Sequence, residues 1–483
     1  MHAIRRANLH ESQSVFLLAA GAVFLAPLFG ISSVLAPTLA LVATGAVVFV
    51  AVAFRSLAAV LALFVLLTFF DRATGLQSIG LTTPVKLAGG VLVLAWLFVV
   101  LGRGWRAPVL FFEQKAFVVG VVLFIAWAFV SALWAAHPGD AAASAFRLAQ
   151  GAILLFIVFA AVRTAPHLWW LILSFIAGAL FATLVGFFGA YAASESVNNA
   201  RLSGGFDDPN ELAAVIVPAL VLSGFAFEAL RGRPARLFLL PVAAVLGLGL
   251  LRTDSQAGLV SLGVACVLAL FFSGPVRDRA VALVAIVVVS ATAYYTFVTA
   301  PVAFQTITSS ENTGARQSLW GVAARVISDH PLLGVGAGNF SDVEQSYALA
   351  TTNLTRVDVV AEGELIHNSY LQVLAELGPP GLLAFLALIA GSLALGLRAA
   401  RSFHRAGNRE LELLARGILI GTAAILVAYF FATNQYEKQL WLLLAVGPVL
   451  DSIAHRFAPA DVALGARASG ARPRARRTAL HRT

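Results

Sequence analysis

The chain has 483 residues, of which 60% are hydrophobic and only 12% are charged, and its formal net charge is +9. A water-soluble domain is usually about half apolar and about a quarter charged, so this composition excludes a soluble globular protein. We therefore expect an all-α protein that crosses a membrane many times. The one cysteine, Cys266, lies in an apolar run, which excludes an internal disulfide and a CxxC metal site.

The apolar segments between charged or Pro/Gly-rich breaks predict about 12–14 transmembrane helices, since a span needs about 20 mostly apolar residues. The first segment follows Arg5 and Arg6, but others succeed it at once, so we interpret it as a span and not as a cleavable signal peptide. The candidate segments are 15–30, 34–54, 57–70, 84–101, 116–134, 146–162, 167–191, 211–230, 236–251, 257–273, 279–300, 371–397, 414–432 and 438–454.

The charges divide between the two sides of this arrangement. Most arginines and lysines fall on the side of the N-terminus, and most acidic residues fall on the other side. The positive-inside rule then places both termini in the cytoplasm. The arginine-rich tail, 456–483, is predicted to be disordered and to lie near anionic lipid headgroups, and we expect no nucleic-acid partner.

The predicted spans divide the chain into four regions: N-terminal spans at 1–300, a large external loop at 301–370, C-terminal spans at 371–455, and the tail at 456–483. Within the loop, residues 315–330 place apolar side chains at helical spacing, which predicts an amphipathic helix lying against the membrane or the bundle. Pro331 should end that helix. The glycine-rich Gly334–Gly338 reads as a tight connector, although a phosphate cradle is the alternative. Further on, Gly378-Pro379-Pro380-Gly381 should kink the next span.

The spans carry almost no charge at their centres, which lowers the probability of an ion-coupled transporter. Polar residues instead gather in the external loop and in two shorter external connections, 192–210 and 252–256. Arginine binds phosphate bidentately, and histidine can accept a proton from a hydroxyl near neutral pH. Such a set suits transfer from a phosphate-activated, lipid-tethered donor to a hydroxyl acceptor. We predict no metal site, because Asp207-Asp208 lacks a third ligand nearby and reads as a turn and helix cap.

Each of the main candidates also has a purely structural interpretation. Arg201 could anchor the chain at the membrane interface, and Arg316 could belong to the polar face of the loop helix. His367 could cap the helix that follows it.

Three elements resemble the O-antigen ligase superfamily, over roughly residues 130–450. The first is Arg201-Leu202-Ser203-Gly204-Gly205-Phe206 with Asp208-Pro209-Asn210. The second is Arg316 and Trp320 leading into His330-Pro331-Leu332-Leu333-Gly334-Val335-Gly336-Ala337-Gly338-Asn339-Phe340. The third is His367-Asn368-Ser369-Tyr370-Leu371 followed by Glu376-Leu377-Gly378.

The resemblance implies a GT-C-like membrane glycosyltransferase that takes a glycan from undecaprenyl diphosphate at the outer face of the bacterial cytoplasmic membrane, without a metal or other cofactor. It implies Arg201 and Arg316 as residues that hold the diphosphate, and His367 as the residue that acts on the acceptor, a lipid or a glycan. Family members often carry an arginine where this chain has Ser255-Gln256, and Arg252, one turn earlier, is the candidate substitute. We add four substrate-binding candidates from the same elements: Asn210, Asn368, Tyr370 and Glu376.

Sequence leaves the acceptor open, because a ligase and a polymerase use the same donor. Two other classes remain: a polysaccharide or lipid transporter with an external loop, and a non-catalytic scaffold for envelope assembly. A continuous polar path across the bundle would favour the transporter, whereas an external cavity closed toward the cytoplasm would favour the transferase.

Overall fold

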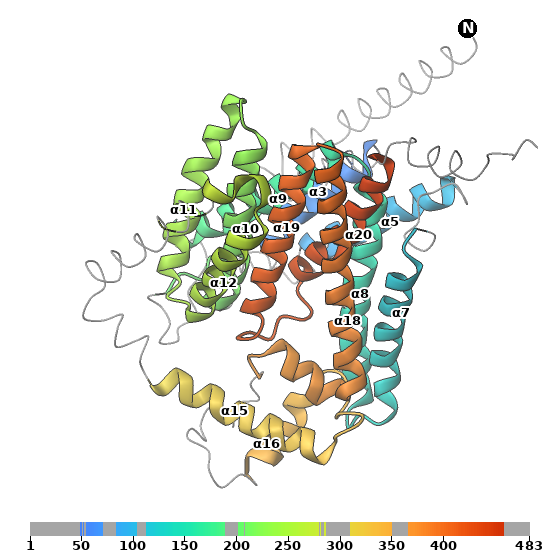
Figure 1. The fold of residues 1–483 in the computed structure, drawn as a ribbon. Helices are drawn as coiled ribbons and strands as arrows, with labels where there is room; N and C mark the ends of the chain where they lie inside the picture. The colour runs from blue at the N-terminus through green and yellow to red at the C-terminus, as the bar shows by residue number, and fades with distance from the viewer. Residues whose placement is uncertain are drawn as a thin grey trace, which may run out of the picture.

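The computed structural model describes residues 55–70, 84–103, 113–188, 201–206, 208–279, 310–349 and 366–457, with a few isolated positions besides. The regular secondary structure of this part of the chain is helical, and these residues contain no β-strand. The bundle helices are α3 (Leu57–Leu67), α5 (Pro84–Arg103), α7 (Lys115–Val130), α8 (Pro138–Ala161), α9 (Ala165–Phe188), α10 (Pro209–Ala229), α11 (Leu239–Arg252), α12 (Gln256–Phe272), α18 (Ser369–Arg405), α19 (Arg409–Ala428) and α20 (Lys438–Phe457). Two further helices, α15 (Ser310–Asp329) and α16 (Phe340–Leu349), lie beneath the bundle in Figure 1.

Eight of these helices are long and apolar enough to cross a membrane, and α3 and α12 are shorter apolar helices. The expected fold class, an all-α polytopic membrane protein, is thereby confirmed. The predicted spans at 15–30 and 279–300, most of 34–54, and the tail beyond 457 lie outside the described residues, so the count of about 12–14 stays a prediction. The largest differences in bounds are at α8, which begins at Pro138 and not at 146, and at α18, which ends at Arg405 and not at 397.

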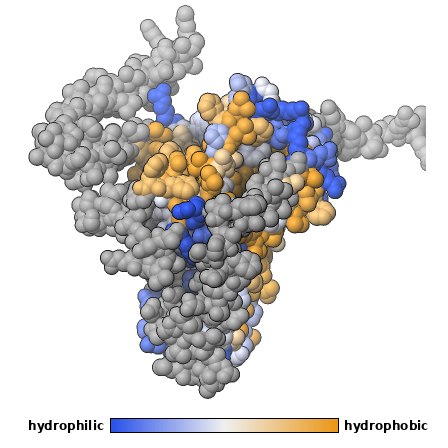
Figure 2. All heavy atoms as spheres, turned by 90° about the vertical axis from the view of Figure 1, so that its left-hand side faces the viewer, coloured by the Kyte–Doolittle hydropathy of each residue, from blue (hydrophilic) through white to orange (hydrophobic). Residues whose placement is uncertain are grey.

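The helices pack around a continuous apolar core. α10 packs along α19, and α18 packs against α7, α19 and α20. Apolar side chains cover much of the described surface in Figure 2, while hydrophilic side chains gather toward its upper and lower ends. We call the end on which α15 and α16 lie the loop end; α8, α10, α12, α18 and α20 begin there (Figure 1).

The predicted amphipathic helix exists as α15, and it packs against the bundle through α18. Its apolar face forms a second small core with α16 and the start of α18. The buried members include Leu319, Val322, Ala323 and Val326, together with Phe340 and Ile366. The helix ends at Asp329, just before His330-Pro331, as expected from proline's missing N–H and its restriction of the preceding residue.

The predicted break in α18 is also confirmed. Gly378 has φ 65° and ψ −176°, so the backbone leaves the helix there before Pro379 and Pro380. The indole N–H of Trp127, on α7, donates to the carbonyl of Leu377 at 2.8 Å. This bond satisfies a carbonyl at the break, which would otherwise be an unpaired polar group in an apolar setting.

The glycine-rich turn at 334–338 fills the space between α8 and α18. Val335 and Gly336 donate their N–H groups to the carbonyls of Ala375 and Glu376, at 3.0 and 2.8 Å. Ala337 donates its N–H to the Ser131 hydroxyl at 3.0 Å. Because these N–H groups are bonded within the protein, the turn is a connector and not a phosphate cradle.

Asn339 completes this junction. Its side chain is fully buried. The Oδ1 atom accepts from the His137 N–H at 2.7 Å, and Nδ2 donates to the carbonyls of His137 and Ala337 at 3.2 and 3.1 Å. One amide thus joins the start of α8 to the loop 202 residues further along the chain.

Replacing Asn339 by alanine should therefore destabilise the protein by about 2–4 kcal/mol, because it removes these bonds and leaves buried backbone groups unpaired. The measurement is the unfolding temperature of the purified protein in detergent. Asn408→Ala is the matched control, since Asn408 makes a single cap bond to the Leu411 N–H at 3.1 Å and should cost about 1 kcal/mol. Equal shifts for the two variants would contradict the role given to Asn339.

Ion pairs join helices at the end opposite the loop end. Glu113 pairs with Arg163 at 2.6 Å and with Arg456 at 3.8 Å. Glu412 pairs with Arg416 at 2.8 Å, and Arg416 also donates to the carbonyl of Phe272 at 2.7 Å. These contacts tie α19 to α12 and the end of α8 to that of α20.

Candidate active site

The first motif, beginning at Arg201, lies against the turn that follows α11. The Arg201 Nε donates to the carbonyl of Thr253 at 2.9 Å, and its Nη2 donates to that of Asp254 at 3.3 Å. The Leu202 N–H donates to the Arg252 carbonyl at 2.9 Å. Arg201 is half-buried and Arg252 is exposed, so two cationic side chains come from adjacent backbone segments at the loop end.

Arg201 thus has a structural contact and also capacity for a ligand. A guanidinium carries five N–H donors, and the two bonds to carbonyls leave several of them available within the described part of the chain. These carbonyls belong to the turn where α11 ends, where a cation is favoured by the helix dipole. Arg201 is therefore held in place by the α11 end and keeps a charged edge for an anion.

Asn210 and Ser255 lock the starts of α10 and α12 together. Ser255 is the N-cap of α12, where its hydroxyl accepts from the Gly258 N–H at 3.0 Å and donates to Asn210 Oδ1 at 2.6 Å. Asn210 Nδ2 donates to Asp208 Oδ1 at 2.9 Å, and Asp208 caps α10 as predicted. Asn210 is buried and bonded within the protein, and its expected contact with substrate stays a prediction.

The third motif fixes His367 through its neighbours. Asn368, and not His367, is the N-cap of α18: its Oδ1 accepts from the N–H groups of Tyr370 and Leu371, each at 3.0 Å. Ser369 donates its N–H to the Tyr429 carbonyl at 2.9 Å. His367 itself is half-buried and has φ 53°, a left-handed backbone conformation that a non-glycine residue seldom adopts.

A backbone strained in this way costs about 1–3 kcal/mol and persists only where the surroundings enforce it. Here the enforcing contacts are the Asn368 cap, the Ser369 bonds to the end of α19, and the Tyr370 hydroxyl, which donates to the Leu426 carbonyl at 2.7 Å. The imidazole is thus presented from an anchored segment at the loop end.

Trp320 joins the second motif to the third. Its indole N–H donates to the Ile366 carbonyl at 3.1 Å, across 46 residues of sequence. Its ring meets Phe430 edge-on, with centroids 5.9 Å apart. Position 316 lies one helical turn before Trp320 on α15, which places it near the His367 segment, although the Arg316 side chain lies outside the described residues.

Glu376 lies beneath the glycine-rich turn in a polar cluster with Arg147. The Glu376 carboxylate is buried and accepts from Gln372, from the Tyr436 hydroxyl at 3.4 Å and from the Gly338 N–H. Arg147 stacks over the Tyr436 ring, with its Cζ 4.5 Å from the centroid, and donates to Ser144 at 2.7 Å. Burial raises the pKa of Tyr436 well above its usual range, and the Glu376 carboxylate raises it further, so the phenol stays a donor.

Tyr429 lies beside the third motif. It is fully buried at the end of α19, and its carbonyl accepts from the Ser369 N–H at 2.9 Å. Burial raises the pKa of its phenol well above the usual range, and the carboxylates of Glu437 and Glu211 raise that pKa further.

The structure therefore groups the predicted site residues in three places on the loop end. Arg201, Arg252 and Asn210 form the first group. The second group consists of His367, Asn368 and Tyr370, and Glu376 belongs to the third, with Arg147. Sequence reasoning counted Arg147 only as an external charge, and no local pattern indicated that it would lie beside Tyr436 and Glu376.

The fold and these groups define a helical membrane protein whose candidate site residues gather at one end, beside a helical loop docked on the bundle. Residues 241–386 match the family model described as O-Antigen ligase. This match confirms the resemblance to the O-antigen ligase and polymerase superfamily and supports a part in membrane glycan processing. The matched segment contains Arg252 and the second and third motifs, but not Arg201. A search of curated proteins found no match.

Proposed function

We propose that this protein is a glycosyltransferase that moves a glycan from undecaprenyl diphosphate to a hydroxyl acceptor at the outer face of the bacterial cytoplasmic membrane. One observation carries the proposal: the Trp320–Ile366 bond brings the Arg316 helix and the His367 segment together inside the matched region. The proposed orientation has both termini and the tail in the cytoplasm, so that the loop end faces outward. We propose the same four regions as the sequence predicts: the N-terminal spans at 1–300, the large external loop at 301–370, the C-terminal spans at 371–455 and the cytoplasmic tail at 456–483.

In the proposed reaction, the anomeric carbon–oxygen bond to the diphosphate breaks and a bond from the acceptor oxygen forms, with inversion. The acceptor hydroxyl gives its proton to His367, and the departing diphosphate keeps the bonding electrons. Arg201, Arg252 and Arg316 would neutralise that negative charge, since guanidinium forks hold phosphate bidentately. Asn210, Asn368, Tyr370 and Glu376 would contact the diphosphate or the glycan, and Asn368 and Tyr370 would also hold the segment that presents His367. The proposal involves no metal or other cofactor in the transfer step.

Product analysis tests the function. Purified protein is incubated with an undecaprenyl-diphosphate-linked glycan, with and without a separate lipid acceptor. Transfer of the glycan to the lipid acceptor identifies a ligase, and a ladder of longer lipid-linked glycans identifies a polymerase. Absence of either product with an intact, folded protein would overturn the proposal and favour a transporter or a scaffold.

Arginine variants test how the diphosphate is held. Arg201→Ala and Arg252→Ala should each raise the KM for the donor about 10–100-fold, because each loses charged hydrogen bonds worth about 1.5–3 kcal/mol. Arg201→Ala should also lower the unfolding temperature, since the bonds to Thr253 and Asp254 are lost. Arg252 is exposed, so Arg252→Ala should fold normally and isolates the effect on binding. An unchanged donor KM in both variants would remove these residues from the site.

A further inference from the structure

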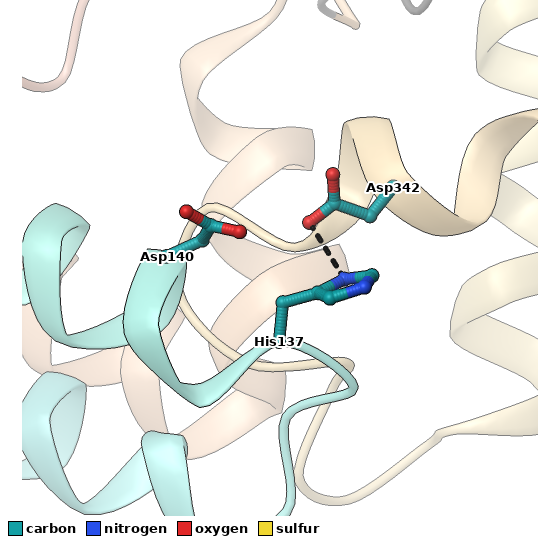
Figure 3. A group of neighbouring side chains, drawn as sticks. All are labelled: His137, Asp140 and Asp342. Carbon is teal, nitrogen blue, oxygen red and sulfur yellow. Dashed lines mark ion pairs between the residues drawn. The ribbon is translucent and has the colours of Figure 1, made fainter.

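Three potential metal ligands from two distant segments meet at the loop end. His137 precedes α8, Asp140 lies in the first turn of α8, and Asp342 lies in the first turn of α16 (Figure 3). Their nearest ligand atoms all lie within 4.8 Å of one another, and His137 Nδ1 is 3.3 Å from Asp342 Oδ2. All three side chains are open to solvent, so an ion and its remaining waters have access.

The backbone beneath this cluster is already fixed. Asn339 bonds to both the N–H and the carbonyl of His137, and it lies three residues before Asp342. The two segments therefore reach the cluster already docked, and only the outer side-chain torsions are left to adjust. Preorganisation of this kind is what lets a three-residue site bind an ion without ordering the chain.

Distances and charge both favour a cation. Two atoms bound at about 2.1 Å to one tetrahedral ion lie about 3.4 Å apart, which agrees with the His137–Asp342 separation. The Asp140 ligand atom, which lies within 4.8 Å of the other two, could approach the ion by a torsion-angle change that an exposed side chain can make. Two carboxylates this close repel each other, and a single imidazole cannot offset both charges.

We propose that His137, Asp140 and Asp342 bind a divalent transition-metal cation, with Zn²⁺ as the best match. One imidazole with two carboxylates suits zinc better than magnesium, which prefers oxygen ligands and near-ideal octahedral geometry. The ion would cross-link α16 to the start of α8, because Asp342 belongs to α16 and the other two ligands to the start of α8. It stands apart from the glycan transfer, so the proposal does not depend on the proposed function.

Binding of Zn²⁺ to the full-length protein tests the site. The protein is purified with an affinity tag that contains no histidine, stripped with a chelator and titrated in detergent or nanodiscs. We expect one equivalent of Zn²⁺ to bind and to slow hydrogen exchange in α16. His137→Ala and Asp342→Asn should each weaken binding at least about tenfold, and Asp140→Asn offers a milder change if either variant fails to fold.

His455→Ala is the matched control. His455 forms a similar pair with Asp451, at 3.6 Å, but within the described residues no third ligand joins that pair. This variant should keep the wild-type affinity and the exchange protection of α16. Failure of the wild type to bind Zn²⁺, or equal binding by His137→Ala and wild type, would overturn the proposal. The two aspartates would then only stabilise the first turns of their helices.

Discussion

Replacing His367 by alanine should lower the rate of glycan transfer about 100–10,000-fold while leaving the amount of folded protein unchanged. A positioned general base contributes a factor of that size, and alanine cannot accept the acceptor's proton. Donor binding should persist, because the arginines that hold the diphosphate are untouched. The measurement is single-turnover transfer from an undecaprenyl-diphosphate glycan under saturating donor.

The control for this variant is His404→Ala, which changes an exposed histidine at the opposite end of the bundle, where His404 pairs with Glu412 at 3.1 Å. It should transfer glycan at the wild-type rate. If His367→Ala also retains its rate, His367 is not the base, and its left-handed backbone has only a structural origin. A loss of folded protein in His367→Ala, seen by size-exclusion chromatography, would likewise contradict the expected result.

Replacing Gly378 by alanine should destabilise the protein by more than about 3 kcal/mol, or prevent its accumulation. The position has φ 65° and ψ −176°, a combination that essentially only glycine adopts, which costs an alanine about 1–3 kcal/mol by itself. A Cβ there would also lie 2.3 Å from the Leu332 carbonyl oxygen, a backbone atom that cannot rotate away. The measurement is the unfolding temperature of the protein in detergent.

Gly407→Ala measures the cost of a positive φ at a position where the added Cβ meets no other atom. Gly407 has nearly the same φ, 67°, but nothing lies within 4 Å of the position that its Cβ would occupy. It should lose only the conformational part, about 1–2 kcal/mol. Similar losses at the two glycines would show that the contact with Leu332 is unimportant and that the turn is not packed against the α18 break.

Hydropathy predicted most of the helices because a bilayer imposes a length and an apolar composition on each span. It failed at the start of α8, where residues 138–145 are small or polar but Ala141, Ser144 and Ala145 are buried, with Ser144 beside Gly338 of the glycine-rich turn. That burial depends on a segment about 200 residues away. A local hydropathy pattern carries no information about it.

The candidate site, like the helices, could be predicted from the sequence only in part. Sequence order placed the motifs on one side of the membrane, and charge asymmetry supported that placement. Nothing local indicated that Arg201 would lie on the carbonyls that follow α11, or that Arg147 would stack on Tyr436. Similarly, His137 and Asp140 lie close together in the sequence at the start of α8, but Asp342 reaches them only through the tertiary fold.

The junction between α7, α8 and α18 also has a consequence for biosynthesis. Trp127 and Leu377 are 250 residues apart, Ser131 and Ala337 are 206 apart, and His137 and Asn339 are 202 apart. At about 5–20 residues per second, roughly 10–50 s separate the synthesis of the two halves of each contact. During that interval α7 and α8 stand without these partners. The loop end is therefore assembled last, and an unfinished chain presents unpaired polar groups that membrane quality control can recognise.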